Sequence, residues 1–295
     1  MTSHVLDAQA GARLFFKCEN LQKTGAFKAR GATNAVFSLS EKEAERGVVT
    51  SSSGNHGAAV AWAAGLRGIP AYIVMPKNAA RTKQASVARY GGEITFCDPA
   101  VPAREAAARQ VADRTRAVFI HPYDDLRVMA GQGTTALELL EQLPELDLIL
   151  CPVGGGGQLS GVAVAAKGMK PGIRIVGVEP SGADDAYRSF KAGYVIHRTD
   201  PNTIADGLRT SLGEKTFIEI RRHVDEIVTV SERSIVDAMR LLWAILKIIV
   251  EPSGAVPLAA ILERKLRFEG KHVALILSGG NLDLDHLPWQ VATPH

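Results

Sequence analysis

The stretch GVVTSSSGNHGAAVAWAAGLRGIPAYIVMP, residues 47–76, is the clearest indication of the fold class. The short run at 48–53 predicts a strand, the alanine-rich run at 58–68 predicts a helix, and the apolar run at 71–76 predicts a second strand. A strand, a helix and a strand in close succession are typical of the βαβ unit, whose two strands lie parallel. We therefore expect a parallel sheet covered by helices.

The same alternation continues along the chain. Further strands are expected at 93–97, 117–122, 146–153, 174–180 and 272–280, and further helices at 80–92, 102–116, 134–143, 158–169, 234–250 and 252–265. This pattern predicts an α/β fold of two open, doubly wound domains. We place the small domain at 47–124 and the large domain at 1–46 plus 125–295. Ligands of such folds bind at the carboxyl ends of the strands, where loops lead into helices.

Composition narrows the class of protein. Of 295 residues, 46% are hydrophobic and 22% are charged, which is typical of a globular domain, and a net charge of +3 is too small for a nucleic-acid-binding surface. The longest apolar run, at 241–250, is interrupted by Lys247 and is too short to cross a bilayer. Cys18, Cys97 and Cys151 are far apart, and no signal peptide is evident. We expect a cytoplasmic protein with reduced thiols and neither nucleic-acid nor membrane partners.

Four consecutive glycines, Gly154–Gly157, stand in CPVGGGGQLSGVA between an expected strand and an expected helix. Without Cβ atoms, their backbone N–H groups can converge on an anion, and the helix start adds positive potential. A flexible turn is the alternative, but such a turn needs only one or two glycines. The spacing matches neither the GxxxxGK[ST] nor the GxGxxG pattern, so we expect a phosphate-bearing ligand other than a nucleoside triphosphate or a dinucleotide.

A second polar loop, TSSSGNHGAAVA at 50–61, also joins a strand to a helix. Its hydroxyl groups, its amide and the helix N-terminus suit a carboxylate. An elaborate helix cap is the alternative, although a cap needs one serine and this loop has three, together with Asn55 and His56. A Ser-His-Asp hydrolase is a poor match, because His56 lies three residues from Ser53 and no GxSxG motif surrounds the serines.

The stretch LQKTGAFKARGA, residues 21–32, contains Lys23, Lys28 and Arg30. Taken alone, each would be an ordinary surface charge, and we keep that interpretation for Lys23 and Arg30. Lys28 differs because it occurs with a phosphate site, a carboxylate site and Ser278, which stands in the loop LSGGNLDL at the carboxyl end of the last expected strand. A lysine amine in such company indicates pyridoxal phosphate, which binds covalently to lysine and acts as an electron sink.

Seven ordered motifs then carry a family resemblance over nearly the whole chain: QKTGAFKARGA, SSSGNHG, VGGGGQLSG, VEPSGADDAY, ADGLRTSLG, EPSGAV and LSGGNLDL. The chain resembles the fold-type II pyridoxal-phosphate enzymes, and within them the group of serine racemases, serine/threonine dehydratases and threo-3-hydroxyaspartate dehydratases. This resemblance implies a fold like that of the tryptophan synthase β-subunit, with pyridoxal phosphate in the cleft between the domains. It also implies a homodimer.

The resemblance assigns a cofactor role to nine residues: Phe27, Lys28, Asn55, Gly154, Gly155, Gly156, Gly157, Gly207 and Ser278. Lys28 would hold the cofactor covalently, and the four glycines would hold its phosphate. Phe27 and Gly207 would lie on opposite faces of the ring. Asn55 would donate to the ring 3-hydroxyl, and Ser278 would contact the pyridine nitrogen.

Substrate roles follow from the same resemblance for Ser52, Ser53, Asn55, His56, Arg104 and Thr210. The first four would receive the α-carboxylate, and Arg104 and Thr210 would face the distal end of the substrate. Lys28 would act as the catalytic base, with Ser53 as a second acid/base on the opposite face. A solvated helix charge is the alternative for Arg104.

The activity implied is dehydration and deamination of serine, threonine or 3-hydroxyaspartate to a keto acid and ammonia, with serine racemisation chemically available. A mainly racemising enzyme is the alternative. A β-replacing synthase is disfavoured by Arg104 and the Glu179/Asp185 pair. A non-catalytic ligand-binding protein is disfavoured by the retention of Lys28 and Ser278.

A metal site is also implied by the resemblance of VEPSGADDAY to the divalent-cation site of the group. Its ligands would be the carboxylates of Glu179 and Asp185 and the carbonyl of Ala183. Oxygen ligands of this kind suit magnesium or calcium. The alternative is a helix N-terminus that carries acidic residues for its own stability.

Overall fold

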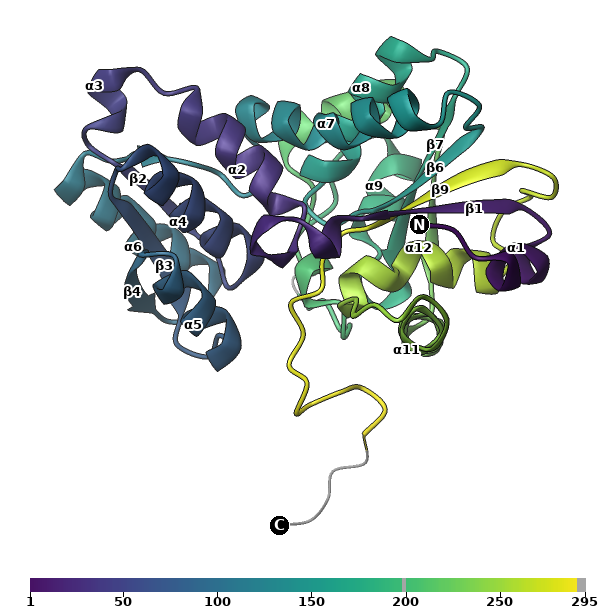
Figure 1. Ribbon diagram of the computed structural model, residues 1–295. Coiled ribbons are helices and arrows are strands. Elements are labelled where there is room, and N and C mark those ends of the chain that lie inside the picture. The colour runs from purple at the N-terminus through teal and green to yellow at the C-terminus, as the bar shows by residue number, and fades with distance from the viewer. Residues whose placement is uncertain (198–199, 291–295) are drawn as a thin grey trace.

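The computed structural model describes residues 1–197 and 200–290, and these form two parallel sheets with helices on both faces (Figure 1). The larger sheet has the strand order β1-β9-β6-β7-β8, and all of its pairings are parallel. Its strands are β1 (Arg13–Cys18), β6 (Leu148–Pro152), β7 (Arg174–Pro180), β8 (Glu226–Val230) and β9 (His272–Leu277).

The smaller sheet has the order β4-β3-β2-β5, again all parallel. Its strands are β2 (Val48–Ser51), β3 (Ala71–Pro76), β4 (Glu93–Cys97) and β5 (Val118–Phe119). The predicted α/β fold with parallel sheets is confirmed. No helix in the described part of the chain is long and apolar enough to cross a membrane.

Helices connect the strands in the manner of βαβ units. The longer helices are α1 (His4–Ala10), α2 (Lys28–Phe37), α4 (Asn55–Arg67), α5 (Arg81–Arg89), α6 (Val101–Thr115), α7 (Leu126–Gln142), α8 (Gly157–Met169), α9 (Asp185–Ala192), α10 (Glu214–His223), α11 (Glu232–Leu241) and α12 (Pro252–Leu262). Shorter helical segments include α3 (Glu41–Ala44), η3 (Ser181–Ala183), η4 (Asp206–Leu208) and η5 (Leu242–Leu246).

Successive side chains of a strand enter different cores, as expected for a sheet covered on both faces. Leu148 and Leu150 of β6 pack in the core that includes α11 and α12, whereas Ile149 and Cys151 pack in the core that includes α7 and α8. The small sheet follows the same rule, with α4 on one face and α6 on the other. The buried strands are therefore short apolar runs rather than alternating ones, which is how the sequence predicted them.

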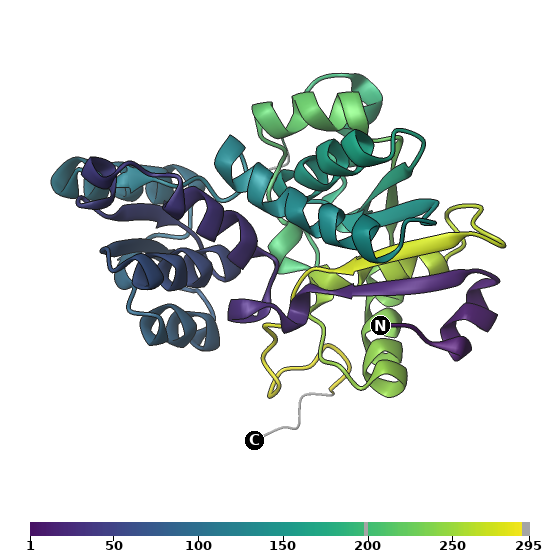
Figure 2. The ribbon, with the colours of Figure 1, turned by 45° about the horizontal axis from the view of Figure 1, so that its top comes forward.

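Helix α2 joins the two halves of the molecule (Figures 1 and 2). Its residues Ala32, Ala35 and Val36 pack into the core of the small sheet, together with Val128 of α7. Gly31 of α2 also lies against the α7 backbone, because a Cβ there would come within 2.7 Å of the Val128 carbonyl oxygen. The lysine-bearing segment is thus packed at the junction of the two sheets.

The helix expected at 234–250 is shorter than predicted. Helix α11 ends at Leu241, one π-helical segment follows to Leu246, and Lys247 then adopts a left-handed backbone with φ 59°. The chain has to turn here because α12 begins at Pro252 and returns across the sheet. Apolar composition alone predicted a helix through 250, and that prediction is wrong for its last four residues.

Arg30 is not the surface charge predicted from sequence. Its side chain is only 9% exposed, and its guanidinium forms ion pairs with Glu19 (2.7 Å) and Glu138 (2.7 Å). Glu19 is 3% exposed and precedes α2, whereas Glu138 lies on α7. The interpretation of Arg30 as solvated is therefore wrong, because its partners come from distant parts of the chain. Lys23, by contrast, is exposed to solvent, as predicted.

Replacing Arg30 by alanine is expected to lower the free energy of unfolding by about 3–5 kcal/mol, because Glu19 is left buried without its cation. Denaturant unfolding of the purified variant measures this loss. Lys23→Ala is the matched control, and a change within about 0.5 kcal/mol is expected there. Equal effects of the two substitutions would contradict the assignment of Arg30 as a structural ion-pair residue.

Candidate active site

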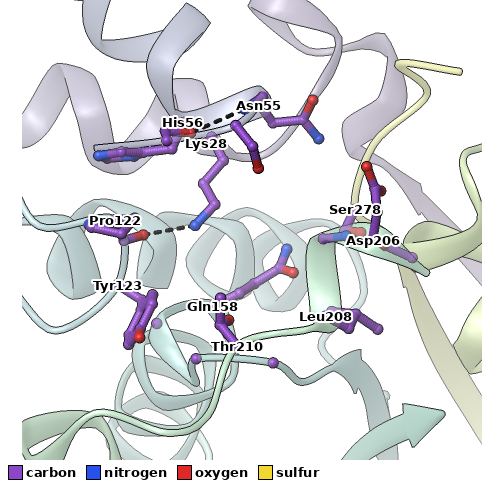
Figure 3. Close-up of a pocket in the computed structure, with 18 of the residues that line it drawn as sticks. Lys28, Asn55, His56, Pro122, Tyr123, Gln158, Asp206, Leu208, Thr210 and Ser278 are labelled. Atoms are coloured by element: carbon purple, nitrogen blue, oxygen red, sulfur yellow. Dashed lines mark hydrogen bonds between the residues drawn. The ribbon is translucent and has the colours of Figure 1, made fainter. Parts of the chain in front are cut away.

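One pocket lies at the carboxyl ends of strands from both sheets (Figure 3). The loops after β2, β6 and β9 all open into it, as parallel sheets with helical crossovers require. All the cofactor and substrate residues predicted from sequence line this pocket: Phe27, Lys28, Ser52, Ser53, Asn55, His56, Arg104, Gly154, Gly155, Gly156, Gly157, Gly207, Thr210 and Ser278. Their functional roles remain predictions.

Lys28 is the first residue of α2, and its side chain points into the pocket (Figure 3). Its Nζ donates a hydrogen bond to the carbonyl of Pro122 at 2.7 Å and lies 5.0 Å from the centre of the Phe27 ring. Burial lowers the pKa of Lys28 from 10.5 to about 8, and the charge of Glu251 acts in the opposite direction. The amine is therefore far more often uncharged near neutral pH than an exposed lysine.

The glycine run connects β6 to α8. Gly156 has φ 87°, a left-handed conformation that favours glycine. A Cβ at Gly155 would come within 2.4 Å of the Tyr123 ring, and one at Gly154 within 2.9 Å of the Leu208 backbone. No side chain can replace these glycines without moving their neighbours. The first-turn N–H groups of α8, which its helix leaves without partners, therefore open directly into the pocket.

The serine-rich loop joins β2 to α4. The Ser52 hydroxyl accepts from the Gly54 N–H at 3.2 Å. Asn55 begins α4, and its amide nitrogen donates to Glu251 at 2.8 Å. His56 is buried, its Nε2 lies 3.4 Å from the Ile120 carbonyl, and burial holds its pKa well below the usual range. The histidine is therefore neutral.

Arg104 enters the pocket from α6 of the small sheet. Its buried Nε has no hydrogen-bond partner among the residues that the structure describes, and the same is true of the Gln158 Nε2. Figure 3 shows Tyr123, Gln158 and Thr210 across the pocket from Asn55. The pocket thus offers two N–H donors, Arg104 Nε and Gln158 Nε2, that no protein group in the described part of the chain uses.

The three predicted metal ligands lie together outside the pocket, where β7 leads through η3 into α9. Glu179 is fully buried and accepts from the backbone N–H groups of Ala186 (3.0 Å) and Tyr187 (2.9 Å). Burial and the neighbouring Asp185 raise the pKa of Glu179 well above its usual range, and burial raises the pKa of Asp185 to about 6. Asp185 Oδ2 is buried without a partner in the described structure.

Sequence reasoning did not select several polar residues of the pocket: Lys83, Gln158, Asp206, Glu251 and Ser253. Lys83 and Asp206 form an ion pair between α5 and η4, and Ser253 accepts from the Gly207 N–H at 3.1 Å. The signal in the sequence was that Gln158 stands in the VGGGGQLSG motif, Glu251 and Ser253 in EPSGAV, and Asp206 in ADGLRTSLG. Lys83 resembled any charge on an exposed helix face.

Comparison with known proteins agrees with this geometry. A family model described as "Pyridoxal-phosphate dependent enzyme" matches residues 1–279. A β-hydroxyaspartate dehydratase of Paracoccus denitrificans is 52% identical over 288 residues, which cover 98% of this chain and 91% of that protein.

Two solved structures have the same fold. Maize serine racemase has a TM-score of 0.95 with 51% identity, covering 97% of this chain and 88% of that one. The processed form of threonine deaminase isoform 2 from Solanum lycopersicum has a TM-score of 0.91 with 32% identity, covering 97% of this chain and 84% of that one.

Proposed function

The chain belongs to the family of pyridoxal-phosphate-dependent enzymes, and on this premise we propose that it eliminates water from a β-hydroxy amino acid. The released enamine product is then hydrolysed by water to a keto acid and ammonia. The observation that carries the proposal is the convergence of Lys28, the α8 N-terminus and Ser278 on one pocket. The substrates are serine, threonine or 3-hydroxyaspartate, as the names of the similar proteins suggest. Release of keto acid from each of these amino acids tests it.

The pocket residues fit pyridoxal phosphate. The four glycines and the α8 N-terminus line the pocket, and their backbone N–H groups suit the phosphate. The Lys28 amine, uncharged in a large fraction near pH 8, suits covalent attachment. The side chains of Phe27 and Ser278 and the backbone of Gly207 line the same pocket and are assigned to the ring faces and the ring nitrogen. When bound, the cofactor supplies an electron sink for negative charge at the amino acid α-carbon.

The chain's own groups then move protons and orient the substrate. Lys28 Nζ, freed when the amino group of the substrate replaces it on the cofactor, would take the α-proton, since burial brings the pKa of this amine close to neutral pH. Ser52 and the α4 N-terminus bind the α-carboxylate. Ser278 offers a hydroxyl rather than a carboxylate to the ring nitrogen, so it does not hold a proton there by charge. That choice favours loss of the β-hydroxyl over transamination.

In this proposal Arg104 discriminates between substrates by the chemical group at their distal end. Its unpartnered Nε suits a second carboxylate, and Thr210 lines the same pocket. The similar protein from Paracoccus denitrificans is named for β-hydroxyaspartate, which carries such a carboxylate. We therefore place 3-hydroxyaspartate ahead of threonine.

Serine racemisation is the second candidate activity, favoured by the similarity to maize serine racemase. It requires an acid/base on the face opposite Lys28, and Ser53 is assigned that role. Ser53→Ala is expected to lower interconversion of L- and D-serine by about 10²- to 10⁴-fold, the usual contribution of one general acid/base. Elimination from L-serine should persist, because Lys28 is intact. Chiral chromatography of serine alongside keto-acid release measures both, and parallel loss of the two activities would contradict this role.

We also propose that Glu179, Asp185 and the Ala183 carbonyl hold magnesium or calcium. Two buried carboxyl groups with raised pKa values, one with an unpartnered oxygen among the described residues, suit a cation. No three His, Cys, Asp or Glu side chains meet in the described residues in a metal-binding arrangement, so carbonyl and water ligands are needed to complete the shell.

Removal of the ion is expected to lower the melting temperature, because an ion at 100 times its Kd stabilises the folded chain by about 2.7 kcal/mol. Thermal unfolding with EDTA, and after addition of magnesium or calcium, measures this. Asp185→Asn should remove the response to ions, whereas Asp237→Asn, at an exposed position of α11, should keep it. A wild-type melting temperature that ignores both chelator and ions would contradict the site.

Three broader expectations complete the proposal. They are a homodimer, a cytoplasmic location and a small domain bounded at 47 and 124. Analytical ultracentrifugation tests the first. Limited proteolysis at the domain junctions tests the third.

A further inference from the structure

Glu251 is a buried acid of the pocket with no role in the proposed function. It precedes the first residue of α12 and is only 3% exposed. Its Oε1 accepts a hydrogen bond from the Asn55 Nδ2 at 2.8 Å. Its Oε2 is buried and has no partner among the described residues. A carboxyl group in this setting is costly to bury unless it has a function or a partner.

The backbone around Glu251 is shaped to hold this carboxylate. Its N–H donates to the Gly279 carbonyl at 3.0 Å, next to Ser278 at the end of β9. A Cβ at residue 279 would lie 2.3 Å from Glu251 Oε1, so the space for the carboxylate depends on a glycine there. The acid is therefore held against the wall of the pocket that carries Ser278.

Asn55 is fixed from both sides by this wall. Its Oδ1 accepts from the Asn281 Nδ2 at 2.9 Å, and that amide also donates to the Thr24 carbonyl at 2.8 Å. Its Nδ2 gives one hydrogen to Glu251, which leaves the second hydrogen for a ligand. The amide of Asn55 can therefore donate to a bound ring only in the orientation that Glu251 and Asn281 impose.

The charged groups around Glu251 come from three elements. Lys83 of α5 and Asp206 of η4 face it and pair with each other, and Lys28 of α2 shares the pocket. Burial raises the pKa of Glu251 to about 7, with Asp206 acting in the same direction and Lys83 and the Asn55 hydrogen bond acting against it. The ionised carboxylate in turn raises the pKa of Lys28.

We propose that Glu251 is a positioning residue for the cofactor: its carboxylate orients the Asn55 amide toward the ring and places a negative charge opposite the Lys28 amine. This inference rests on the proposed function, because it requires pyridoxal phosphate in this pocket. According to this inference, one buried acid sets the orientation of the Asn55 amide and also shifts the protonation equilibrium of the Lys28 amine. Charge on Glu251 favours the ammonium form of Lys28, so loss of that charge favours the free amine at lower pH.

The test uses the 295-residue chain after its cofactor has been removed. The rate at which this protein captures pyridoxal phosphate covalently is measured at a series of pH values, with the rise in visible absorbance as the readout. In the wild-type protein the rate should rise with pH through about 8, as free Lys28 amine forms. Glu251→Gln keeps an acceptor for Asn55 but removes the charge. In this variant the pH at which the capture rate is half-maximal should be lower than in the wild type. The affinity for pyridoxal phosphate should fall about tenfold, because a charged hydrogen bond becomes a neutral one.

Three further variants distinguish the effect of the Glu251 charge from the effect of the orientation of Asn55. Glu251→Asp keeps the charge, so its pH of half-maximal capture should stay near that of the wild type even where affinity falls. Asn281→Ser loosens Asn55 without changing charge, so affinity should fall at an unchanged pH of half-maximal capture. Glu263→Gln, at the other end of α12, should alter neither quantity.

Two results would each overturn this inference and leave the proposed function intact. One is a Glu251→Gln variant with wild-type affinity for pyridoxal phosphate and the wild-type pH of half-maximal capture. The other is a pH of half-maximal capture that shifts as far in Glu251→Asp as in Glu251→Gln. A wild-type chain that captures no pyridoxal phosphate would overturn the proposed function, and this inference with it. Should Glu251→Gln fold poorly, Asn281→Ser keeps the test decisive, because unchanged affinity in that variant would also overturn the inference.

Discussion

Lys28→Ala is expected to abolish both covalent cofactor binding and turnover, with a loss of at least about 10⁴-fold in kcat, the upper range for a general acid/base. The physical reason is that the half-buried Lys28 lies next to the Phe27 ring and that desolvation lowers the pKa of its amine to about 8. Visible absorbance of the purified protein, measured after incubation with pyridoxal phosphate, checks the first effect. A keto-acid assay checks the second.

Lys23→Ala is the matched control for this experiment. Lys23 lies five residues away in the same segment and does not line the pocket, so neither cofactor binding nor turnover should change. Melting curves of the two variants exclude a loss of fold as the cause. A Lys28→Ala protein that still releases keto acid at a rate near that of the wild type would contradict the assignment of the base.

Arg104→Ala is expected to lower kcat/KM far more for a substrate with two carboxylates than for a substrate with one. For threo-3-hydroxyaspartate, kcat/KM should fall about 10²-fold or more, because a buried carboxylate would lose its charged partner. For serine, which has no second carboxylate, the fall should be no more than about threefold, within the range for a lost packing contact. Steady-state kinetics with both substrates measure this difference.

The control for Arg104 is Arg109→Ala, since Arg109 lies on the same helix and its side chain is 78% exposed. Both substrates should be turned over as in the wild type. Equal losses for the two substrates in Arg104→Ala would show that Arg104 supports the fold of the pocket rather than selecting a diacid.

The fold was predictable because buried parallel strands are short apolar runs separated by amphipathic helices. The pocket was predictable because strand ends in such a fold converge, which brings Ser53, Gly156 and Ser278 together from three loops. Local sequence patterns are sufficient for the strands, helices and loops, and the general geometry of a parallel sheet then brings the loops together.

The missed features depend on partners that are distant in sequence. Arg30 finds Glu138 at a separation of 108 residues, and Asn55 finds Glu251 at a separation of 196. A charge that will be buried against such a partner has the same local sequence as one that will be solvated. The end of the helix after Leu246 was missed for a similar reason, because the turn at Lys247 is imposed by the packing of α12.

The most direct test of the central claim is a keto-acid and ammonia release assay of the purified protein, with pyridoxal phosphate present, on threo-3-hydroxyaspartate, L-serine and L-threonine. We expect keto acid and ammonia in equal amounts from at least one of the three, with 3-hydroxyaspartate preferred to threonine. Cofactor-loaded protein that releases neither product from any of them would contradict the proposed function.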